Sequence, residues 1–511
     1  MRLWLAMLWA CAGGDGASGA KDADTTVDAD SDADADADAD SDTDADADSD
    51  ADVDTGTPPS GCAVDRWDPA DFATVIDVGP GHAALTPSDV PWESLDAGTL
   101  VRIWPNGSAY RDKWVIAAAG TEAEPVVVLG VCDPSTGALP VIDGDGAVTR
   151  RALDFWSETR GVVKIGGASA PSQTPSWVYV EDLEIRGARA GHTFTDDGGN
   201  AATYDDNAAA VFLEEGAHVT IRGCTLTDSG NGFFASHASS DVVLSSNHVY
   251  GNGNVGSAFE HNNYTESDGI TFEYNHFGPL CAGCSGNNLK DRSAGTVIRY
   301  NWIEGGNRQL DLVESDDAGI RAEPSYRETF VYGNVLVEPD GDGNSQVVHY
   351  GGDGGDDAIY RRGTLYFYQN TVVSERTGNT TLVRLSDAFE SVDVRNNVLS
   401  VDGRLAVLEA RGAAALGTNW VTQGWTDSFE GGAFQGTVDD EGSNTVGTDP
   451  GFTDRLGHDF TLAPGADPID AGGALAAAAA GHPADRAYVV HQQGDARPDD
   501  GAVDQGAFEA R

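Results

Sequence analysis

A short phrase recurs through the middle of the chain and constrains its fold more than any other feature. The phrase reads apolar-x-apolar-x-x-Asn-x-apolar and returns roughly once per 25 to 35 residues. Its clear copies centre on Asn247, Asn275, Asn301, Asn334, Asn370 and Asn397. Two earlier copies carry Cys224 and Leu183 in the Asn position. A phrase repeated at this interval predicts a solenoid in which each copy is one coil.

The residues around each Asn predict how the coils stack. Apolar residues on a period of two would point the same way and build one continuous core, with coils about 4.8 Å apart. These residues are Leu244, Phe272, Ile298, Val331, Phe367 and Val394. Asn would form the corner, because it tolerates left-handed backbone and its amide can bond to the Asn above and below. The alternative is that these Asn residues occupy unrelated hairpin turns.

This pattern resembles the right-handed parallel β-helix of the pectate-lyase-like superfamily, whose inner turn carries an asparagine ladder. The resemblance implies an all-β fold, with the β-helix over residues 100–410. Residues 61–99 are expected to form an N-terminal cap, and residues 411–511 the last coils and a C-terminal cap. Such a cap would cover the strand edges at the open end of the solenoid.

The N-terminal residues predict export. Residues 1–10 are expected to be a signal peptide, and Leu8-Trp9-Ala10-Cys11 resembles a lipoprotein cleavage motif in which Cys11 carries the lipid. A wrong start codon or a non-lipidated export signal are alternatives. Residues 11–60 are expected to be a disordered spacer, because residues 22–54 alternate Asp with small residues and cannot form a core. We expect an outer-membrane or cell-surface lipoprotein, or a secreted protein, that touches the membrane only through its lipid.

The charge of the chain bears on its partners. The sequence holds 83 acidic and 30 basic residues, so nucleic acid is not an expected partner. An anionic polymer would need a local group of cations or a bound cation. We expect a monomer.

The cysteines allow three assignments. Cys224 occupies a ladder position and is expected to be a buried free thiol. Cys281 and Cys284 favour a local disulfide over zinc, because no second pair of ligands follows at the required spacing. Cys62 and Cys132 could join the N-terminal cap to the first coils.

A second strand of each coil carries an unusual number of polar residues and predicts the functional site. If Leu289, Leu310 and Leu312 point inward, then Asn288, Lys290, Gln309 and Asp311 point outward on neighbouring coils. The candidate residues for substrate binding are Tyr264, Asn288, Arg308, Gln309, Gln346 and Tyr350. The carboxylates of Asp311, Glu314 and Asp353 could hold calcium, although their spacing matches no calcium loop.

Residues 260–368 resemble a group of secreted bacterial β-helix proteins described as polysaccharide-degrading, and the resemblance spans residues 100–511. It implies a polysaccharide as partner and, from the superfamily, a lyase that cleaves uronic-acid polymers by β-elimination. Lys290 would be the base, with its pKa lowered by burial or by Arg292 and Arg308, and Arg292 would stabilise charge. His261 and His349 are alternative proton-transfer groups.

Three other interpretations remain open from the sequence. The Lys–Asp–Arg group could form structural salt bridges between coils. The protein could bind a glycan or another protein without cleaving it. It could also be a glycoside hydrolase that uses Asp311 with Glu314 or Asp353, although the Asn-Thr-Asp and Asp-Asp signatures of polygalacturonases are absent.

Overall fold

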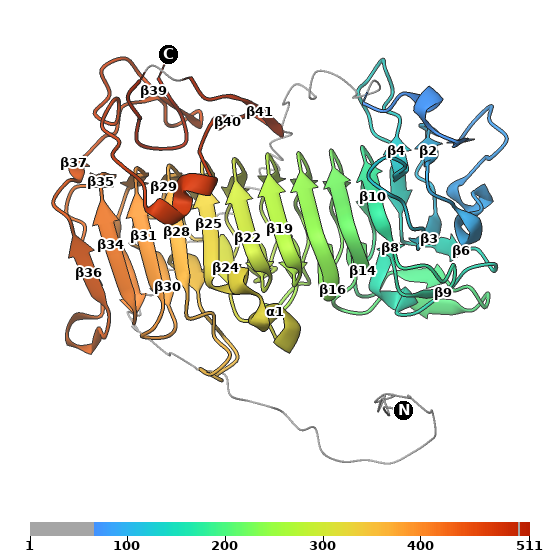
Figure 1. Cartoon of the computed structure of the whole chain (residues 1–511), viewed down its shortest axis with the longest axis horizontal. Coiled ribbons are helices and arrows are strands. Elements are labelled where there is room, and N and C mark those ends of the chain that lie inside the picture. Colours follow the sequence, from blue (N-terminus) through green and yellow to red (C-terminus); the bar gives the residue numbers. More distant parts are fainter. Residues whose placement is uncertain (1–65, 499–500, 511) are drawn as a thin grey trace, which may run out of the picture. The chain divides into compact units, whose positions relative to one another are not determined.

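The computed structural model describes residues 66–498 and 501–510, and within them the chain winds into a parallel β-helix (Figure 1). Each coil contributes one strand to each of up to three parallel sheets, which we call A, B and C. Cys11, Cys62 and the residues expected to form a signal peptide and a spacer lie outside the described residues. Among the described residues, no helix is both long enough and apolar enough to cross a membrane.

Sheet A holds the strand that precedes the repeated Asn. Its strands pair in parallel, each with the equivalent strand of the next coil. They are β1 (Thr74–Val78), β2 (Thr99–Ile103), β4 (Val126–Gly130), β10 (Ser176–Glu181), the second halves of β14 (Ala209–Arg222) and β16 (Asn231–Ser245), β19 (Asp268–Glu273), β22 (Ala294–Arg299), β25 (Glu328–Tyr332), β28 (Thr364–Tyr368), β31 (Ser391–Arg395), β34 (Ala413–Gly417) and β36 (Thr437–Asp440).

Sheet B follows the Asn. It runs through β5 (Val141–Asp143), β11 (Glu184–Arg186), β15 (Thr225–Leu226), β17 (His248–Val249), β20 (His276–Phe277), β23 (Trp302–Glu304), β26 (Val335–Glu338), β29 (Thr371–Ser374), β32 (Val398–Val401), β35 (Trp420–Thr422) and β37 (Thr445–Gly447).

Sheet C completes the coil. It contains β3 (Asp112–Ile116), β8 (Gly161–Ile165), the first halves of β14 and β16, β18 (Asn263–Thr265), β21 (Leu289–Asp291), β24 (Leu310–Leu312), β27 (Gln346–Tyr350), β30 (Asn379–Leu385) and β33 (Arg404–Ala410). A short helix, α1 (Ala318–Ala322), lies in the loop between β24 and β25.

The predicted core and Asn ladder are confirmed. The six apolar residues of the phrase align in register from coil to coil and are buried. In the ladder, Asn275 Nδ2 donates to Asn301 Oδ1 over 2.9 Å, and Asn301 Nδ2 donates to Asn334 Oδ1 over 2.9 Å. The ladder also continues beyond the predicted copies, through Asn419 to Asn444.

The left-handed corner is not formed by the Asn residues, as the sequence analysis expected, but by the residue before each of them. Ser246, Tyr274 and Tyr300 have φ values of 58°, 56° and 54°. The Asn amide then satisfies backbone groups that this turn leaves unpaired, as when the Asn301 side chain accepts from Asn275 N–H and donates to the Phe272 carbonyl. The ladder Asn is therefore a buried hydrogen-bonding residue, and its neighbour adopts the unusual backbone.

The first strand of the β-helix is β1, within the residues expected to form the N-terminal cap, and the last strand of sheet B is β37, within the residues expected to hold the last coils. The chain between β1 and β2 packs against the first coils, where Trp92 stacks on Trp114 with ring centroids 5.0 Å apart. Short alternating runs such as Thr74–Val78 do not include the Asn phrase, so the repeat alone does not reveal them.

The C-terminal segment lies along the flank of the β-helix (Figure 1). Phe460, Tyr488 and Phe508 pack on Trp302, Val335, Val337 and Val373, which form the outer face of sheet B. Gln492 reaches back to donate to the Ser246 carbonyl over 3.0 Å. This segment therefore covers the apolar outer face of sheet B.

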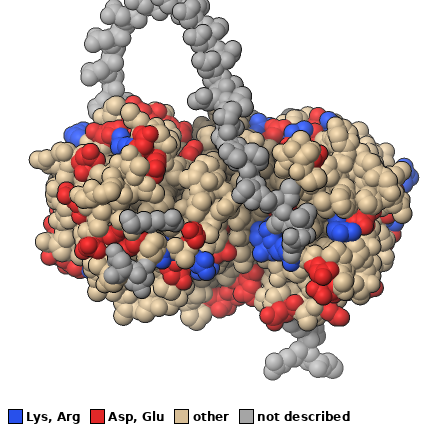
Figure 2. Space-filling view, turned by 90° about the horizontal axis from the view of Figure 1, so that it is seen from above, with Lys and Arg blue, Asp and Glu red and all other residues tan. Residues whose placement is uncertain are grey.

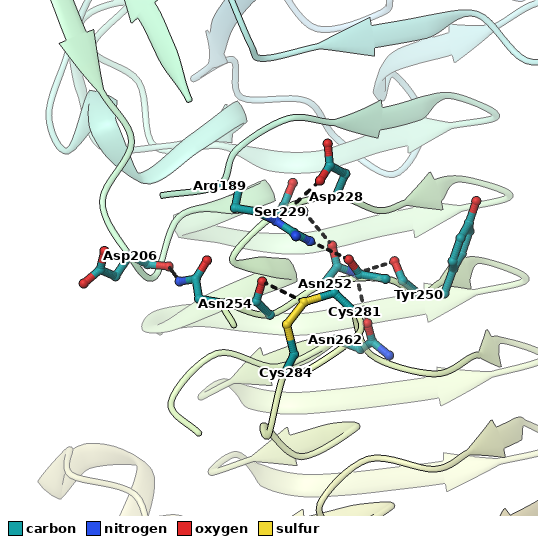
Figure 3. The surroundings of a disulfide bond; sticks show 12 residues. Arg189, Asp206, Asp228, Ser229, Tyr250, Asn252, Asn254, Asn262, Cys281 and Cys284 are labelled. Carbon is teal, nitrogen blue, oxygen red and sulfur yellow. Dashed lines mark hydrogen bonds and ion pairs between the residues drawn. A yellow bond between two sulfur atoms is a disulfide. The ribbon is translucent and has the colours of Figure 1, made fainter. Parts of the chain in front are cut away.

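A second, shorter series of amides lies between sheets B and C. Asn252 Nδ2 donates to Asn262 Oδ1, and Asn262 Nδ2 donates to Asn288 Oδ1, each over 3.0 Å. The predicted Cys281–Cys284 disulfide is formed beside this series (Figure 3), and Cys224 is a buried free thiol, as predicted. These amides hold the turns that directly precede β18 and β21.

The ladder generates a stability prediction. Asn301→Ala removes the acceptor for the Asn275 N–H and side-chain amide in a dry interior, so we expect the free energy of unfolding to fall by about 2–4 kcal/mol. Asn444→Ala is the matched control, because Asn444 is the last member and half-exposed, where water can replace it. Urea denaturation measures both, and equal losses would contradict the account.

Candidate functional site

Successive strands of sheet C align one outward-facing residue per coil, and we call this series the outward row. The residues on either side of each member point into the core, as Leu289, Leu310 and Val348 do. The register of the strands places these residues side by side: Lys164, Phe212, Phe234, Tyr264, Lys290, Asp311, His349, Arg384 and Glu409. The predicted contact between Lys290 and Asp311 on neighbouring coils is confirmed.

Lys290 lies between two carboxylates. Its Nζ is 2.8 Å from Asp311 Oδ2 and 2.5 Å from Asp353 Oδ2, and the residue is 7% exposed. Burial lowers the pKa of the Lys290 ammonium, but the two carboxylates outweigh burial and hold that pKa above its usual range. The prediction that Lys290 is a base with a lowered pKa is therefore wrong for this arrangement, in which Lys290 is a bound cation.

Arg292 supplies a second cation to the same carboxylate. Its guanidinium is 3.2 Å from Asp353 Oδ1 and donates to the Glu314 backbone carbonyl over 2.5 Å. The guanidinium also lies 5.8 Å from the centroid of the Tyr264 ring. The salt-bridge interpretation is thus correct about these contacts, because Asp353 is held by Lys290 and Arg292 together.

Asp311 is the centre of the hydrogen-bond network. Its Oδ2 accepts from Lys290 and from Asn287 Nδ2 at 2.8 Å, and its Oδ1 is 2.8 Å from His349 Nδ1. The Arg308 guanidinium is 3.6 Å from Oδ1. Burial raises the pKa of the Asp311 carboxyl, but Lys290 and His349 outweigh burial and hold it well below its usual range. Asp311 is therefore an ionised acceptor.

His349 is neutral, and its tautomer follows from its neighbours. Burial lowers the pKa of His349 despite the adjacent carboxylate. Because ionised Asp311 can only accept, Nδ1 carries the proton, and Nε2 accepts from the Ser386 hydroxyl over 2.7 Å. Ser386 directly follows β30 and was not among the residues predicted from the sequence.

His261 occupies a separate position. Its Nδ1 accepts from the Asn287 N–H over 2.9 Å, and its ring meets Tyr264 edge-on at 5.5 Å between centroids. Burial lowers the pKa of His261 to about 3. With Nδ1 occupied as an acceptor, the neutral ring has no free lone pair, so His261 is not placed to accept a substrate proton.

The remaining predicted binding residues divide into two groups. Arg308 and Gln346 lie at the rim, where Arg308 Nε donates to Gln346 Oε1 and Gln346 Nε2 donates to Glu409 Oε1, each over 2.8 Å. Tyr264 is half-buried in the outward row between Phe234 and Lys290. Arg308, Gln346 and Tyr264 therefore lie around the Lys290 and Arg292 cations.

The other group is interior, which corrects the prediction that these residues contact substrate. Asn288 belongs to the second amide series, and Gln309 is buried and donates to the Val337 carbonyl. Tyr350 is fully buried, because the strand alternation points it into the core near Arg361.

The carboxylates of Asp311, Glu314 and Asp353 contact donors of the protein itself. Asp311 and Asp353 bind the Lys290 ammonium, and Glu314 accepts from the N–H groups of Asp353 and Gly354 at 2.9 and 2.6 Å. The part of the chain that the structure describes holds no cluster of His, Cys, Asp and Glu suited to a metal. Calcium stays a prediction, and no step below depends on it.

Two further charged groups were missed by the sequence analysis. Arg384 follows His349 in the outward row, where its distance from Asn370 resembles that of His349 from Asn334. Aligning the coils by the ladder would have found it. Arg361 and Asp291 form an ion pair inside the core at 3.4 Å, and both are fully buried. No pattern around Arg361 marks it as an interior residue.

Comparison with known proteins supports the fold. Residues 174–372 match a family model described as a right handed beta helix region, so this part of the resemblance is confirmed. A search of curated proteins gives no match. Solved structures with similar folds include pectate lyase Pel9A, an alginate lyase from Paenibacillus sp. str. FPU-7 and a GH136 lacto-N-biosidase from Eubacterium ramulus.

These structural similarities are distant. Pel9A is 13% identical with a TM-score of 0.47, over 86% of this chain and 97% of its own. The alginate lyase is 13% identical with a TM-score of 0.43, over 72% and 99%. The lacto-N-biosidase is 12% identical with a TM-score of 0.45, over 73% and 67%. Similarity at this level says nothing of the activity, and the fold rests on the strand pairing and the family model.

The buried histidine generates a pH prediction. Unfolded His261 binds a proton below about pH 6.5, whereas folded His261 binds one only near pH 3, so its folded pKa is depressed. Stability is therefore lost as pH falls through this window, by about 1.4 kcal/mol per pH unit for this group. We expect His261→Gln to reduce the slope of unfolding free energy against pH between about pH 6 and 4.5, measured by urea denaturation. An unchanged slope would contradict the assignment.

Proposed function

We propose that the outward row of sheet C binds an extracellular polysaccharide that contains uronic acids, and that the protein cleaves it by β-elimination. The observation that carries this proposal is the Asp353 carboxylate held between Lys290 and Arg292. A uronic acid carries the same chemical group, and replacing one carboxylate by another keeps both cations paired. The export signal predicted for residues 1–10 agrees with an extracellular substrate.

The loop that carries Asp353 is suited to such an exchange. Asp353 lies in the run Gly351-Gly352-Asp353-Gly354-Gly355, and residues 353–358 are exposed. The Asp353 side chain is 32% exposed, whereas Lys290 and Arg292 side chains are 9% and 11% exposed. Displacement of Asp353 would therefore open two preorganised cations to solvent while Asp311 keeps Lys290 in position.

The electrostatics of the surface agree with a local anion site. Acidic side chains are spread over the face drawn in Figure 2, and basic side chains gather there in small groups. An acidic polymer meets net repulsion over most of such a surface, so binding depends on the cations at one place. Tyr264 and Phe234, next to Lys290 in the outward row, supply half-buried aromatic rings on which sugar rings could stack.

Two roles in elimination can be assigned to groups in the site. Lys290 and Arg292 neutralise the uronate carboxylate, which makes the neighbouring C–H more acidic. His349 is the proposed proton acceptor, because it is neutral and its Nε2 carries the free lone pair once Ser386 releases it. As the proton leaves, a C=C bond forms and the C–O bond to the leaving sugar breaks, and the leaving oxygen takes the proton that His349 has accepted. Lys290 therefore stabilises charge together with Arg292, whereas the sequence predicted this role for Arg292 alone.

Two rival functions lead to other outcomes. A hydrolase needs a protonated carboxyl as its acid. Donors hold the pKa of the Asp311 carboxyl well below its usual range, whereas burial raises the pKa of the Glu314 carboxyl, whose two oxygens accept from the N–H groups of Asp353 and Gly354. A non-catalytic binding protein would use the same cations without any bond cleavage.

The activity test is incubation of the purified chain with a panel of uronic-acid polysaccharides, with calcium or with chelator. We expect rising ultraviolet absorbance from the unsaturated sugar that elimination creates. New reducing ends without that absorbance would indicate hydrolysis. Binding without either product would favour the non-catalytic protein.

The exchange of carboxylates generates a binding prediction. Asp353→Asn removes the internal competitor, so we expect the Kd for a short oligouronate to fall about two- to fivefold, since a partly exposed ion pair is worth up to about 1 kcal/mol. Isothermal titration calorimetry measures the change. Asp357→Asn is the matched control, because it removes the same charge from the same exposed loop. Equal effects of both variants would contradict a specific role for Asp353.

A further inference from the structure

We propose that Ser386, His349 and Asp311 form a nucleophilic triad that hydrolyses carboxylic esters on the bound polysaccharide. The Ser386 hydroxyl is 2.7 Å from His349 Nε2, and His349 Nδ1 is 2.8 Å from Asp311 Oδ1. A serine, a histidine and an aspartate connected in this order constitute the arrangement that activates a serine in acyl transfer. The three residues come from neighbouring coils of sheet C and its following turn.

The direction of each hydrogen bond is fixed by the surroundings. Asp311 Oδ2 accepts from Lys290 Nζ and from the Asn287 amide, so Asp311 is ionised and cannot donate. Burial lowers the pKa of His349, and the neutral ring that results donates to Asp311 through Nδ1 and accepts through Nε2. The hydroxyl proton of Ser386 therefore points at the nitrogen that would remove it.

The turn that carries Ser386 is rigidly held. Glu390 Oε2 accepts from the N–H groups of Ser386 and Asp387 at 2.7 and 2.8 Å, and Asp387 accepts from Arg362 Nε at 2.8 Å. Ser386 itself is half-buried rather than enclosed. Phe389, 73% exposed in the same turn, places an apolar surface beside it. The hydroxyl is thus positioned by its turn and reachable from the surface.

The same turn determines where the oxyanion could be stabilised. Because Glu390 occupies the N–H groups of Ser386 and Asp387, these two amides are not available to a substrate oxygen. Arg384 is the neighbour of His349 in the outward row, and its guanidinium donates to Glu409 over 2.6 Å through only one of its nitrogens. We assign charge stabilisation to Arg384, which keeps other donors.

The reaction balances with water as the only co-reactant. Ser386 Oγ attacks the ester carbonyl carbon while its proton passes to His349 Nε2. The tetrahedral intermediate collapses, the C–O bond to the alcohol breaks, and the alcohol takes that proton. Water then attacks the acyl-serine by the same route, which releases the carboxylic acid and restores Ser386. The ester could be an O-acyl group on a sugar or the alkyl ester of a uronic acid.

Elimination and ester hydrolysis would share His349, but only hydrolysis needs the Ser386 hydroxyl. The proposal therefore stands or falls separately from β-elimination. Ser386→Ala is expected to abolish ester hydrolysis, and the absorbance of the unsaturated product reports on elimination separately.

The test treats the full chain with a fluorophosphonate probe and maps the modified residue by mass spectrometry. We expect labelling at Ser386, and a fall of at least about a hundredfold in hydrolysis of p-nitrophenyl acetate for Ser386→Ala. Arg384→Gln should slow hydrolysis without preventing labelling of the folded protein. Ser391→Ala is the matched control, because Ser391 is also half-buried but bonds to Thr364.

Two polysaccharide substrates distinguish the source of the ester. Release of acetate from an O-acetylated polymer would identify an O-acyl group on a sugar as the substrate. Release of methanol from a methyl-esterified uronate polymer would identify the alkyl ester of a uronic acid. Folded wild-type protein that is not labelled at Ser386, or that hydrolyses esters no faster than Ser386→Ala, would overturn the proposal. Labelling of Ser386 in the wild-type chain tests the proposal even if a variant fails to fold.

Discussion

The asparagine ladder is the interaction on which the rest of the structure depends. Each ladder amide bonds to the next and to backbone groups of the coil before, as Asn275 does with Asn301 and the Leu244 carbonyl. A slip of one residue would leave these amides buried and unpaired, and would turn every core side chain outward. The ladder therefore fixes the register of sheet A, and the same coil-to-coil stacking aligns the strands of sheet C, where the second amide series holds the turns before β18 and β21. The order of the outward row is a consequence of this register.

Within the outward row, Asp311 contacts both proposed sites: the cations that bind a carboxylate and the histidine that activates Ser386. On one side it anchors Lys290, which together with Arg292 binds the Asp353 carboxylate. On the other side it orients His349 toward Ser386. A buried carboxylate with three kinds of donor is stable only when all of them are present, so its neighbours are held as one unit. One aspartate thereby prepares a carboxylate-binding site and an activated imidazole on adjacent coils.

The sequence predicted the elements that repeat and missed those that do not. The Asn phrase predicted the core, the ladder and the contact of Lys290 with Asp311, because a period of two and a constant corner leave one register. It could not predict that Asp353 folds over Lys290, since loop conformation follows no period. The prediction that Tyr350 and Gln309 face the substrate was wrong, because both side chains point into the interior of the β-helix. The predicted direction of the Lys290 pKa shift was wrong, because Asp311 and the loop carboxylate of Asp353, more than 60 residues away in sequence, together outweigh burial.

A crystal structure of the protein with a short oligouronate bound would test the central claim most directly. The account predicts a uronate carboxylate between Lys290 Nζ and the Arg292 guanidinium, with Asp353 displaced and Asp311 still bound to Lys290. An oligosaccharide bound elsewhere, with Asp353 in place on both cations, would show that these ion pairs only hold the loop on the β-helix.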